Sequence, residues 1–198
     1  TVNLGRRLNL RQYGRNLDAM IVGVVKESMP DERRVALVPA SVPPLVKDGW
    51  EVVIEPGAGA EAGFADAAYQ EKGARIAADR AEVFAAADVL LQVRSLGANL
   101  EQGVTDLELI RAGQVLIGFC DPLGSPAAAQ QIAARGGVLF AMELIPRITR
   151  AQSMDALSSM ASIAGYKAVL LAAVELPKIF PMMMTAAGTI SPSKVFVV

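Results

Sequence analysis

The sequence of 198 residues contains no histidine and a single cysteine, Cys120. Without imidazole and with one thiol, the chain lacks the ligands from which zinc sites are usually built. The common serine and cysteine triads lose their general base for the same reason. One cysteine also excludes an internal disulfide, which is typical of proteins in reducing compartments. We therefore expect no metal site, and a chemistry that works without a histidine.

An excess of one charge and long apolar runs are also missing. The chain has 19 basic and 20 acidic side chains, a net charge of -1, so electrostatics gives no reason to expect binding to nucleic acid or to an acidic membrane surface. The longest continuous apolar runs, such as 168–174, are much shorter than the roughly 20 residues of a membrane-spanning helix. We expect no nucleic-acid partner and no direct insertion into a membrane.

The first 19 residues differ from the rest in composition. They contain one acid, Asp18, and no apolar block of the kind found in signal peptides. They also contain four arginines, Arg6, Arg7, Arg11 and Arg15. This composition is typical of a transit-type segment or of residues that precede the natural start, so residues 1–19 are excluded from the fold prediction.

From residue 20 onward, short apolar runs alternate with segments that carry helix signals. The runs are continuously apolar, as expected of strands covered on both faces, and occupy 20–25, 51–54, 89–93, 115–119 and 137–141. Ser41 and Ser125 precede prolines that suit a first helical turn, and Gly49 and Gly136 lie near the helix ends. We predict an α/β domain over 20–150, with a doubly wound parallel sheet of flavodoxin-like or Rossmann-like type.

Beyond residue 150 the pattern changes. Residues 153–176 predict one long helix, a loop rich in proline and methionine follows, and 194–198 predict a buried strand. We therefore expect 151–198 to hold a connecting helix, a loop and the opening strand of a second domain. A last strand of the first sheet is the alternative that composition leaves open.

Two loops of the α/β domain resemble ligand-binding motifs. Residues 57–62 have the G-x-G-x-x-A form of a dinucleotide loop, with Asp79 at a suitable spacing for a ribose contact. A helix must start within such a loop, whereas Asp66 indicates a later start, so we interpret these glycines as an ordinary turn. The charged loop 31–37 follows the first strand, where α/β folds bind ligands, but a solvated run of charges is the simpler interpretation.

The predicted long helix carries a polar stripe on an otherwise apolar sequence. At about 100° per residue, one sector collects Gln152, Asp155, Ser159, Ser162 and Tyr166. A buried polar group without a partner costs roughly 1–3 kcal/mol, so these side chains need partners from the protein or from a ligand. Capping of the helix by Ser153 or Asp155, with a close helix contact, explains the pattern equally well.

Residues 147–159 resemble the NAD(H)-binding component, domain I of the alpha subunit, of proton-translocating NAD(P) transhydrogenases. The resemblance extends from about residue 20 to the end, and its further matches are 26–28, 34–39, 55–59, 164–169 and 182–189. The early matches are shared with alanine dehydrogenases, whereas 147–159 is specific to transhydrogenases.

This resemblance implies hydride transfer between NAD(H), bound here, and NADP(H), bound by a partner domain. It implies catalytic roles for Arg147, Gln152 and Asp155. The implied cofactor-binding residues are Arg147, Ile148, Thr149, Gln152, Ser153, Met154, Asp155 and Ser158. Because hydride transfer changes no substrate oxygen or nitrogen, positioning of two nicotinamide rings suffices and no histidine is needed.

The same resemblance implies partners and a location. Transhydrogenase domain I is a homodimer that works with membrane-spanning and NADP(H)-binding components, which couple hydride transfer to proton translocation. It lies in the cytoplasm on the inner face of the membrane, or on the matrix side in mitochondria. In the family, a glycine-rich dinucleotide loop follows the strand that corresponds to 194–198. The resemblance thus implies that 151–198 hold the connecting helix, the loop and the first strand of an incomplete NAD-binding Rossmann domain. We therefore expect these 198 residues alone to be inactive and to bind NAD(H) weakly or not at all.

Two alternatives belong to other classes. An alanine dehydrogenase-like amino acid dehydrogenase would keep Arg34 at a position that resembles the substrate-carboxylate arginine. That family also uses a lysine and a histidine for the carbonyl chemistry, and this chain has no histidine. The second alternative is a non-catalytic α/β interaction module.

Overall fold

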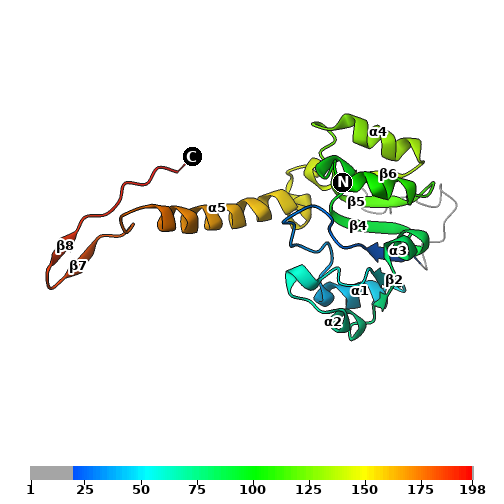
Figure 1. Ribbon diagram of the computed structural model, residues 1–198, viewed down its shortest axis with the longest axis horizontal. Helices are drawn as coiled ribbons and strands as arrows, with labels where there is room; N and C mark the ends of the chain where they lie inside the picture. The colour runs from blue at the N-terminus through cyan, green and yellow to red at the C-terminus, as the bar shows by residue number, and fades with distance from the viewer. Residues whose placement is uncertain (1–19, 198) are drawn as a thin grey trace. The chain divides into compact units, whose positions relative to one another are not determined.

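The computed structural model describes residues 20–197 (Figure 1). Its internal contacts divide the chain into a first unit that ends at Ile145 and a second unit that begins at Pro146. The predicted leader, 1–19, lies outside the described residues. The two units are considered separately below.

The first unit is built on a six-stranded parallel sheet in the order β3-β2-β1-β4-β5-β6. Its strands are β1 Ile21–Val24, β2 Glu51–Ile54, β3 Arg75–Ile76, β4 Val89–Arg94, β5 Val115–Phe119 and β6 Val138–Ala141. The direction of the strand order reverses between β1 and β4, and open α/β sheets bind ligands at such a switch point. The predicted doubly wound parallel sheet is confirmed, although the two-residue β3 was not expected.

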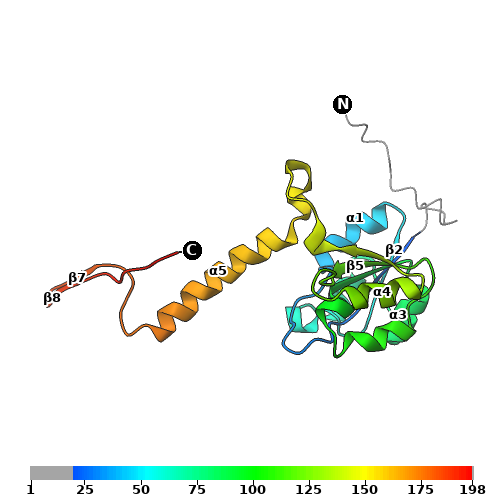
Figure 2. The same ribbon diagram turned by 90° about the horizontal axis from the view of Figure 1, so that it is seen from above.

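Helices cover both faces of this sheet (Figure 2). They are α1 Val42–Lys47, α2 Asp66–Gln70, α3 Arg80–Ala86 and α4 Pro126–Ala134. Short 3₁₀ turns lie at Pro39–Ser41, Ala60–Ala62, Leu96–Ala98, Gly103–Glu108 and Met142–Leu144. Successive strand residues point to opposite faces, which explains why the apolar runs are continuous.

Two core clusters show this alternation directly. Val53 and Leu90 pack in one cluster with Phe84 of α3 and Ile132 of α4. Val52 and Ile54 pack in the other cluster, which includes Val42 of α1 and Tyr69 of α2. Neighbouring residues of β2 thus belong to different cores, so a strictly alternating pattern of apolar and polar residues would have left one face without a core.

Gly23 in β1 is needed because α3 approaches the strand closely. A Cβ at this position would lie 2.6 Å from the Cβ of Ala87 and 2.8 Å from Cγ1 of Val83. Such contacts are shorter than close-packed interiors allow. The absence of a side chain at Gly23 therefore allows α3 to lie this close to β1.

The second unit contains a 3₁₀ turn, a long helix and a hairpin. The turn is Thr149–Met154, the helix is α5 Ala156–Glu175, and β7 Met183–Thr185 pairs antiparallel with β8 Gly188–Ile190. The helix begins three residues later than predicted because Asp155 caps it. The hairpin was not predicted, since short exposed strands lack a buried periodic pattern.

The strand predicted at 194–198 is not formed among the described residues. Residues 194–197 are extended but have no regular strand assignment, and Val195, Phe196 and Val197 are all exposed. A strand requires a neighbour for its backbone hydrogen bonds, and none pairs with this segment within residues 20–197. A buried strand is thus absent from 194–197, while the assignment of this segment to a second domain stays a prediction.

Helix α5 is unusually apolar for a helix that has no buried residue. By length and composition it could cross a membrane, with a mean hydropathy of 1.5, and it is the one such helix among the described residues. This corrects the expectation that no segment reaches that length, because alanine, glycine and serine extend the helix beyond its continuous apolar runs. A helix enclosed by protein on all sides has the same composition, so this is weak evidence for a membrane span.

Candidate functional site

The segment that carries the expected site residues is a compact turn in the second unit. Ile148 donates its backbone N–H to Pro146 at 2.9 Å, and Ala151 donates to Ile148 at 2.9 Å. Ala151 is buried, whereas Arg147, Gln152 and Ser153 around it are exposed. In this turn the small side chain of Ala151 is therefore buried, and the polar side chains are exposed to solvent.

Asp155 and Ser158 are the two expected site residues that a side-chain hydrogen bond connects among the described residues. Asp155 Oδ1 accepts the Ser158 backbone N–H at 2.9 Å, and Oδ2 accepts the Ser158 hydroxyl at 2.6 Å. These hydrogen bonds, first the hydroxyl and then the amide, hold the pKa of Asp155 below its usual value, and the charge of Arg147 acts in the same direction. The carboxylate is therefore ionised at neutral pH.

The other expected site residues are not connected to this pair by side-chain hydrogen bonds. Within residues 20–197, no side-chain hydrogen bond is formed by Arg147, Thr149, Gln152 or Ser153. Ile148 and Met154 are both more than half exposed. The eight residues thus share one short segment, in which the polar side chains of Arg147, Thr149, Gln152 and Ser153 are exposed.

The polar stripe predicted along the helix is only partly present. Gln152 and Asp155 precede α5 and do not belong to its face. Ser159 donates its hydroxyl to the Asp155 carbonyl, and Ser162 donates to the Ser158 carbonyl, both at 3.2 Å. These two serines are satisfied by their own helix and do not require a ligand.

No α-helix begins within the glycine-rich loop at 57–62, in agreement with its interpretation as a turn. Helix α2 begins at Asp66, well after the glycines, and the Asp66 carboxylate accepts the Gly57 N–H at 2.9 Å. Asp79 caps α3 by accepting the Glu82 N–H at 2.8 Å. Both acids thus have structural partners within the first unit.

The charged loop 31–37 is only partly a solvated run of charges, which corrects the simpler interpretation: Asp31 and Arg33 are exposed, whereas Glu32 and Arg34 are partly buried. Glu32 accepts Arg34 Nε at 2.7 Å and Arg94 Nε at 2.9 Å. Its side chain is only 6% exposed, and the hydrogen bond from Arg34, as the largest cause, lowers the pKa of Glu32 to about 2. The loop folds over the carboxyl ends of β1 and β4.

Glu27 joins the same edge of the sheet from the first residues after β1. It accepts the backbone N–H groups of Val93 at 2.6 Å and Arg94 at 3.0 Å. These bonds lie where the register of β4 shifts against β5. The carboxylate therefore accepts backbone N–H groups at a point where the pairing of the two strands is irregular. Burial is the main reason why the pKa of Glu27 is raised.

A second ion cluster at this edge centres on Arg80. Its Nε and Nη2 donate to the two Asp106 oxygens at 2.7 Å each, and Nη1 donates to Glu55 at 2.9 Å. Gln92 donates to Asp106 at 2.9 Å. Sequence reasoning missed this cluster and Glu27, because the partners are far apart along the chain and each looks like an ordinary surface charge.

Cys120 is buried at the end of β5 and is not an activated nucleophile. Burial, followed by the nearby Glu143 charge, raises the pKa of its thiol to about 12. Glu143 Oε1 accepts the backbone N–H groups of Cys120, at 2.8 Å, and of Asp121. Among the described residues, no group of three or more metal-ligating side chains is arranged to hold an ion.

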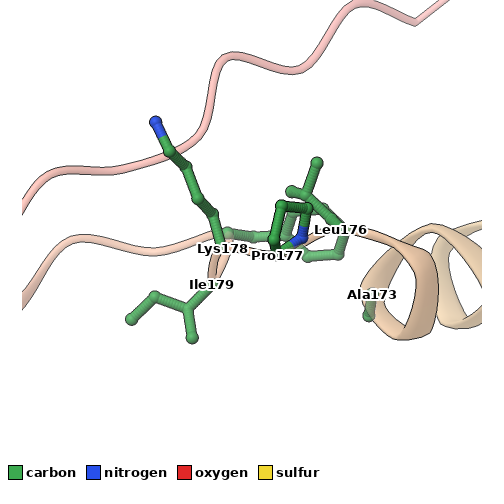
Figure 3. Close-up of a pocket in the computed structure, with 6 residues that line it drawn as sticks. Ala173, Leu176, Pro177, Lys178 and Ile179 are labelled. Carbon is green, nitrogen blue, oxygen red and sulfur yellow. The ribbon is translucent and has the colours of Figure 1, made fainter.

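A surface pocket of about 400 Å³ lies where α5 ends (Figure 3). Its lining is Ala173, Leu176, Pro177, Lys178, Ile179 and Phe180. The lining side chains are apolar except for Lys178. Its side chain extends away from the Pro177 ring (Figure 3). A specific ligand site usually needs a few convergent polar groups, which this pocket does not provide.

The amino-acid sequence is similar to known proteins over most of its length. Residues 23–164 match the family model of the alanine dehydrogenase/PNT N-terminal domain. The chain is 43% identical over 178 residues to an NAD(P) transhydrogenase alpha-subunit protein of Rhodospirillum rubrum, covering 90% of this chain and 46% of that protein. It is 32% identical over 159 residues to alanine dehydrogenase of Bacillus subtilis, covering 80% and 39%.

The fold is likewise similar to a solved transhydrogenase. The crystal structure of the transhydrogenase from Sinorhizobium meliloti superimposes with a TM-score of 0.79 at 45% identity, covering 87% of this chain and 49% of that one. The chain therefore spans about half, or less, of the length of these relatives. The similarity to transhydrogenases inferred from residues 147–159 is confirmed at the level of the family.

Proposed function

The chain belongs to the family of the alanine dehydrogenase/PNT N-terminal domain, and from this premise we propose that it is part of the NAD(H)-binding component of a proton-translocating NAD(P) transhydrogenase. The observation that carries the proposal is the exposed segment from Arg147 to Ser158, with an ionised Asp155 bonded to Ser158. The greater identity to a transhydrogenase subunit than to an alanine dehydrogenase, 43% against 32%, supports this choice.

The proposed reaction asks the protein to position groups rather than to exchange protons. The bound nicotinamide supplies or receives the hydride. Arg147 and Gln152 present guanidinium and amide groups that can hold ribose hydroxyls and a carboxamide, and Asp155 and Ser158 lie beside them in the chain. Correct placement of two reacting rings can contribute several kcal/mol, about 7–11 in favourable model reactions.

The remaining parts of the proposal concern the intact protein. Because the relatives are about twice as long as this chain, we assign to these residues the nicotinamide end of the site only. NADP(H) binding and proton translocation are assigned to partner components in the membrane, with this component as a homodimer on the cytoplasmic or matrix side. Within the described residues, the exposed apolar α5 is the surface best suited to such contacts.

Hydride transfer from NADH to an NADP⁺ analogue, measured with the intact gene product and its membrane and NADP(H)-binding partners, tests the proposal. Arg147→Gln and Gln152→Asn should each lower the rate at least about tenfold, since each removes a positioning contact. The control is Arg150→Gln, which changes another exposed arginine of the same segment and should retain activity. Unchanged rates in both site variants would show that the site assignment is wrong.

An alanine dehydrogenase-like activity is the second candidate. Its support is the pair Arg34 and Arg94 at the switch point of the sheet, together with the 32% identity to an alanine dehydrogenase. The chain has no histidine for the carbonyl chemistry, so we expect no oxidation of NADH that depends on pyruvate and ammonia. A robust signal in that assay would replace the transhydrogenase proposal.

A further inference from the structure

Residues 26–34, called the β1 loop below, are joined to the end of β4 by two carboxylates. Glu32 bonds the Arg94 side chain at 2.9 Å, whereas Glu27 bonds backbone N–H groups of β4. The paired part of β1 stops at Val24, which lies opposite Leu91. The Glu27 carboxylate therefore takes the place of a strand neighbour for the last residues of β4.

The two oxygens of Glu27 divide these N–H groups between them. Val93 donates to Oε1 at 2.6 Å, and Arg94 donates to Oε2 at 3.0 Å. The donors are consecutive residues, and both can reach one side chain because β4 is irregular at this point. An ionised carboxylate accepts at both oxygens, whereas protonation turns one oxygen into an O–H donor. Glu27 can therefore hold both N–H groups only while it is ionised.

Charged groups from several elements surround this carboxylate. Burial, as the largest cause, raises the pKa of Glu27 above its usual value of 4.5, and the Glu32 charge acts in the same direction. The two backbone N–H groups and the charge of Arg80 act against this rise. The charged neighbours are Glu32 and Arg34 in the β1 loop, Arg94 in β4, Arg80 in α3, and Glu55 after β2, which bonds both Arg80 and the Lys26 N–H.

We propose that Glu27 is a proton-sensitive latch between the β1 loop and β4, which holds the Val93 and Arg94 N–H groups when ionised and releases that of Arg94 when protonated. The proton enters at Oε2, because the hydrogen bond there is the longer of the two. The ion pair from Glu32 to Arg94 is then the remaining side-chain hydrogen bond between this loop and β4 among the described residues. The inference does not rest on the proposed function, since it concerns the first unit only.

Opening of the latch is local. Protonation of Glu27 also removes a charge from a partly buried position, which favours the folded state as the pH falls. The β1 loop stays tied to the domain, because Asn99 donates to the Ser28 hydroxyl at 2.9 Å and Arg80 donates to the Lys26 carbonyl at 2.8 Å. We therefore expect faster exchange at one backbone N–H group without unfolding of the domain.

Amide hydrogen exchange of the intact gene product, resolved to single residues and corrected for the intrinsic effect of pH, tests the proposal. Between about pH 7 and pH 4, the protection of Arg94 should fall about tenfold, the factor that one hydrogen bond to a charged group contributes. Val93 should keep its protection. Glu32 remains ionised over this range, because its pKa is about 2. In Glu27→Gln a single side-chain oxygen remains, so Arg94 should be weakly protected at both pH values.

Glu143 provides the matched control. Its Oε1 alone accepts the N–H groups of Cys120, at 2.8 Å, and of Asp121, while its Oε2 has no hydrogen-bond partner among the described residues. Protonation at Oε2 leaves both bonds in place. Cys120 should therefore be equally protected at both pH values, in the wild type and in Glu143→Gln.

Three results would overturn the proposal. The first is a protection of Arg94 in the wild type that does not change with pH. The second is a pH-dependent fall at Arg94 that persists in Glu27→Gln, which would assign the titration to another group. The third is an equal fall at Cys120, which would indicate a general loosening of the sheet edge in acid instead of a latch at Glu27.

Discussion

Two glutamates at the carboxyl edge of the sheet, Glu27 and Glu32, have pKa values that are shifted in opposite directions. The pKa of Glu32 is lowered to about 2 by Arg34, whereas burial raises the pKa of Glu27. Both side chains lie in the loop after β1. The difference arises because Glu32 is paired with two guanidinium groups, while Glu27 accepts uncharged backbone N–H groups.

A change in pH should separate the contributions of Glu32 and Glu27 to the free energy of unfolding. Because the folded pKa of Glu32 is depressed, its stabilisation is complete above its usual value of 4.5 and is lost as the pH falls toward 2. Glu27 has the opposite sign, since a raised pKa favours the folded state as the pH falls. Glu32→Gln should lower the free energy of unfolding at pH 7 by about 2 kcal/mol and flatten its pH dependence below 4.5. Urea unfolding at pH 7 and pH 3.5 measures both effects, with Glu61→Gln, an exposed partner of Arg33, as a control without such a change.

The thiol of Cys120 gives a second test at the residue scale. Its pKa of about 12, caused mainly by burial, leaves almost no thiolate at pH 8, and the thiolate is the reactive form. We expect negligible labelling by iodoacetamide in the folded protein and rapid labelling in urea. Rapid labelling under native conditions would contradict both the burial of the side chain and its protonated state.

At the scale of elements, Arg80 connects parts of the chain that local sequence cannot relate. It lies at the start of α3 and bonds Asp106, Glu55 and the Lys26 carbonyl. The loops after β1 and β2 and the 3₁₀ turn Gly103–Glu108 are thus held at one edge. The cluster is mostly withdrawn from solvent, with side-chain exposures of 21% for Arg80 and 8% for Asp106.

Removal of this cation should therefore be costly. Arg80→Met leaves two acids without their partner, and breaking one side of a buried pair costs about 3–5 kcal/mol. Arg75→Met is the matched control, because Arg75 also bonds two glutamates, Glu51 and Glu82, but is 43% exposed. Its loss should cost less than about 1 kcal/mol. Equal losses in the two variants, measured by urea unfolding, would show that burial of the cluster is not the deciding factor.

The elements also show which parts of the structure could be predicted. The central strands were predictable because both of their faces are buried, which makes their sequences continuously apolar. Residues 194–198 carry the same local pattern, yet 194–197 form no strand, since pairing depends on a neighbour that local sequence does not specify. The segment 147–158 was identified through family resemblance, and its hydrogen bonds could not be derived from spacing. Likewise, the bond from Val93 to Glu27 joins residues 66 positions apart.

At the scale of the whole molecule, the two units differ in how they bury apolar surface. The first unit has well-packed clusters on both faces of its sheet. In the second unit, large side chains of α5 and of the hairpin are exposed, including Ile163, Leu171 and Met184. Exposure of so many large apolar side chains is unusual for a soluble monomer and is typical of an interaction surface.

This contrast predicts the behaviour of a shortened chain. Residues 1–198 should bind the dye ANS strongly and self-associate at high concentration, because the second unit exposes apolar surface. Residues 1–145 should bind little dye and remain monomeric. ANS fluorescence and sedimentation of the two chains measure the difference. Equal dye binding would place the exposed apolar surface on the first unit instead.

The central position of β1 has a consequence for synthesis of the protein. β1 pairs on one side with β2 and on the other with β4, where Val22 lies opposite Val89. A ribosome that adds about 5–20 residues per second needs roughly 3–13 s to make the intervening chain. During that time one edge of the earliest strand has unpaired backbone N–H and C=O groups, and the side chains on its faces are apolar. The nascent chain is therefore a natural client for a chaperone that shields strand edges until β4 emerges.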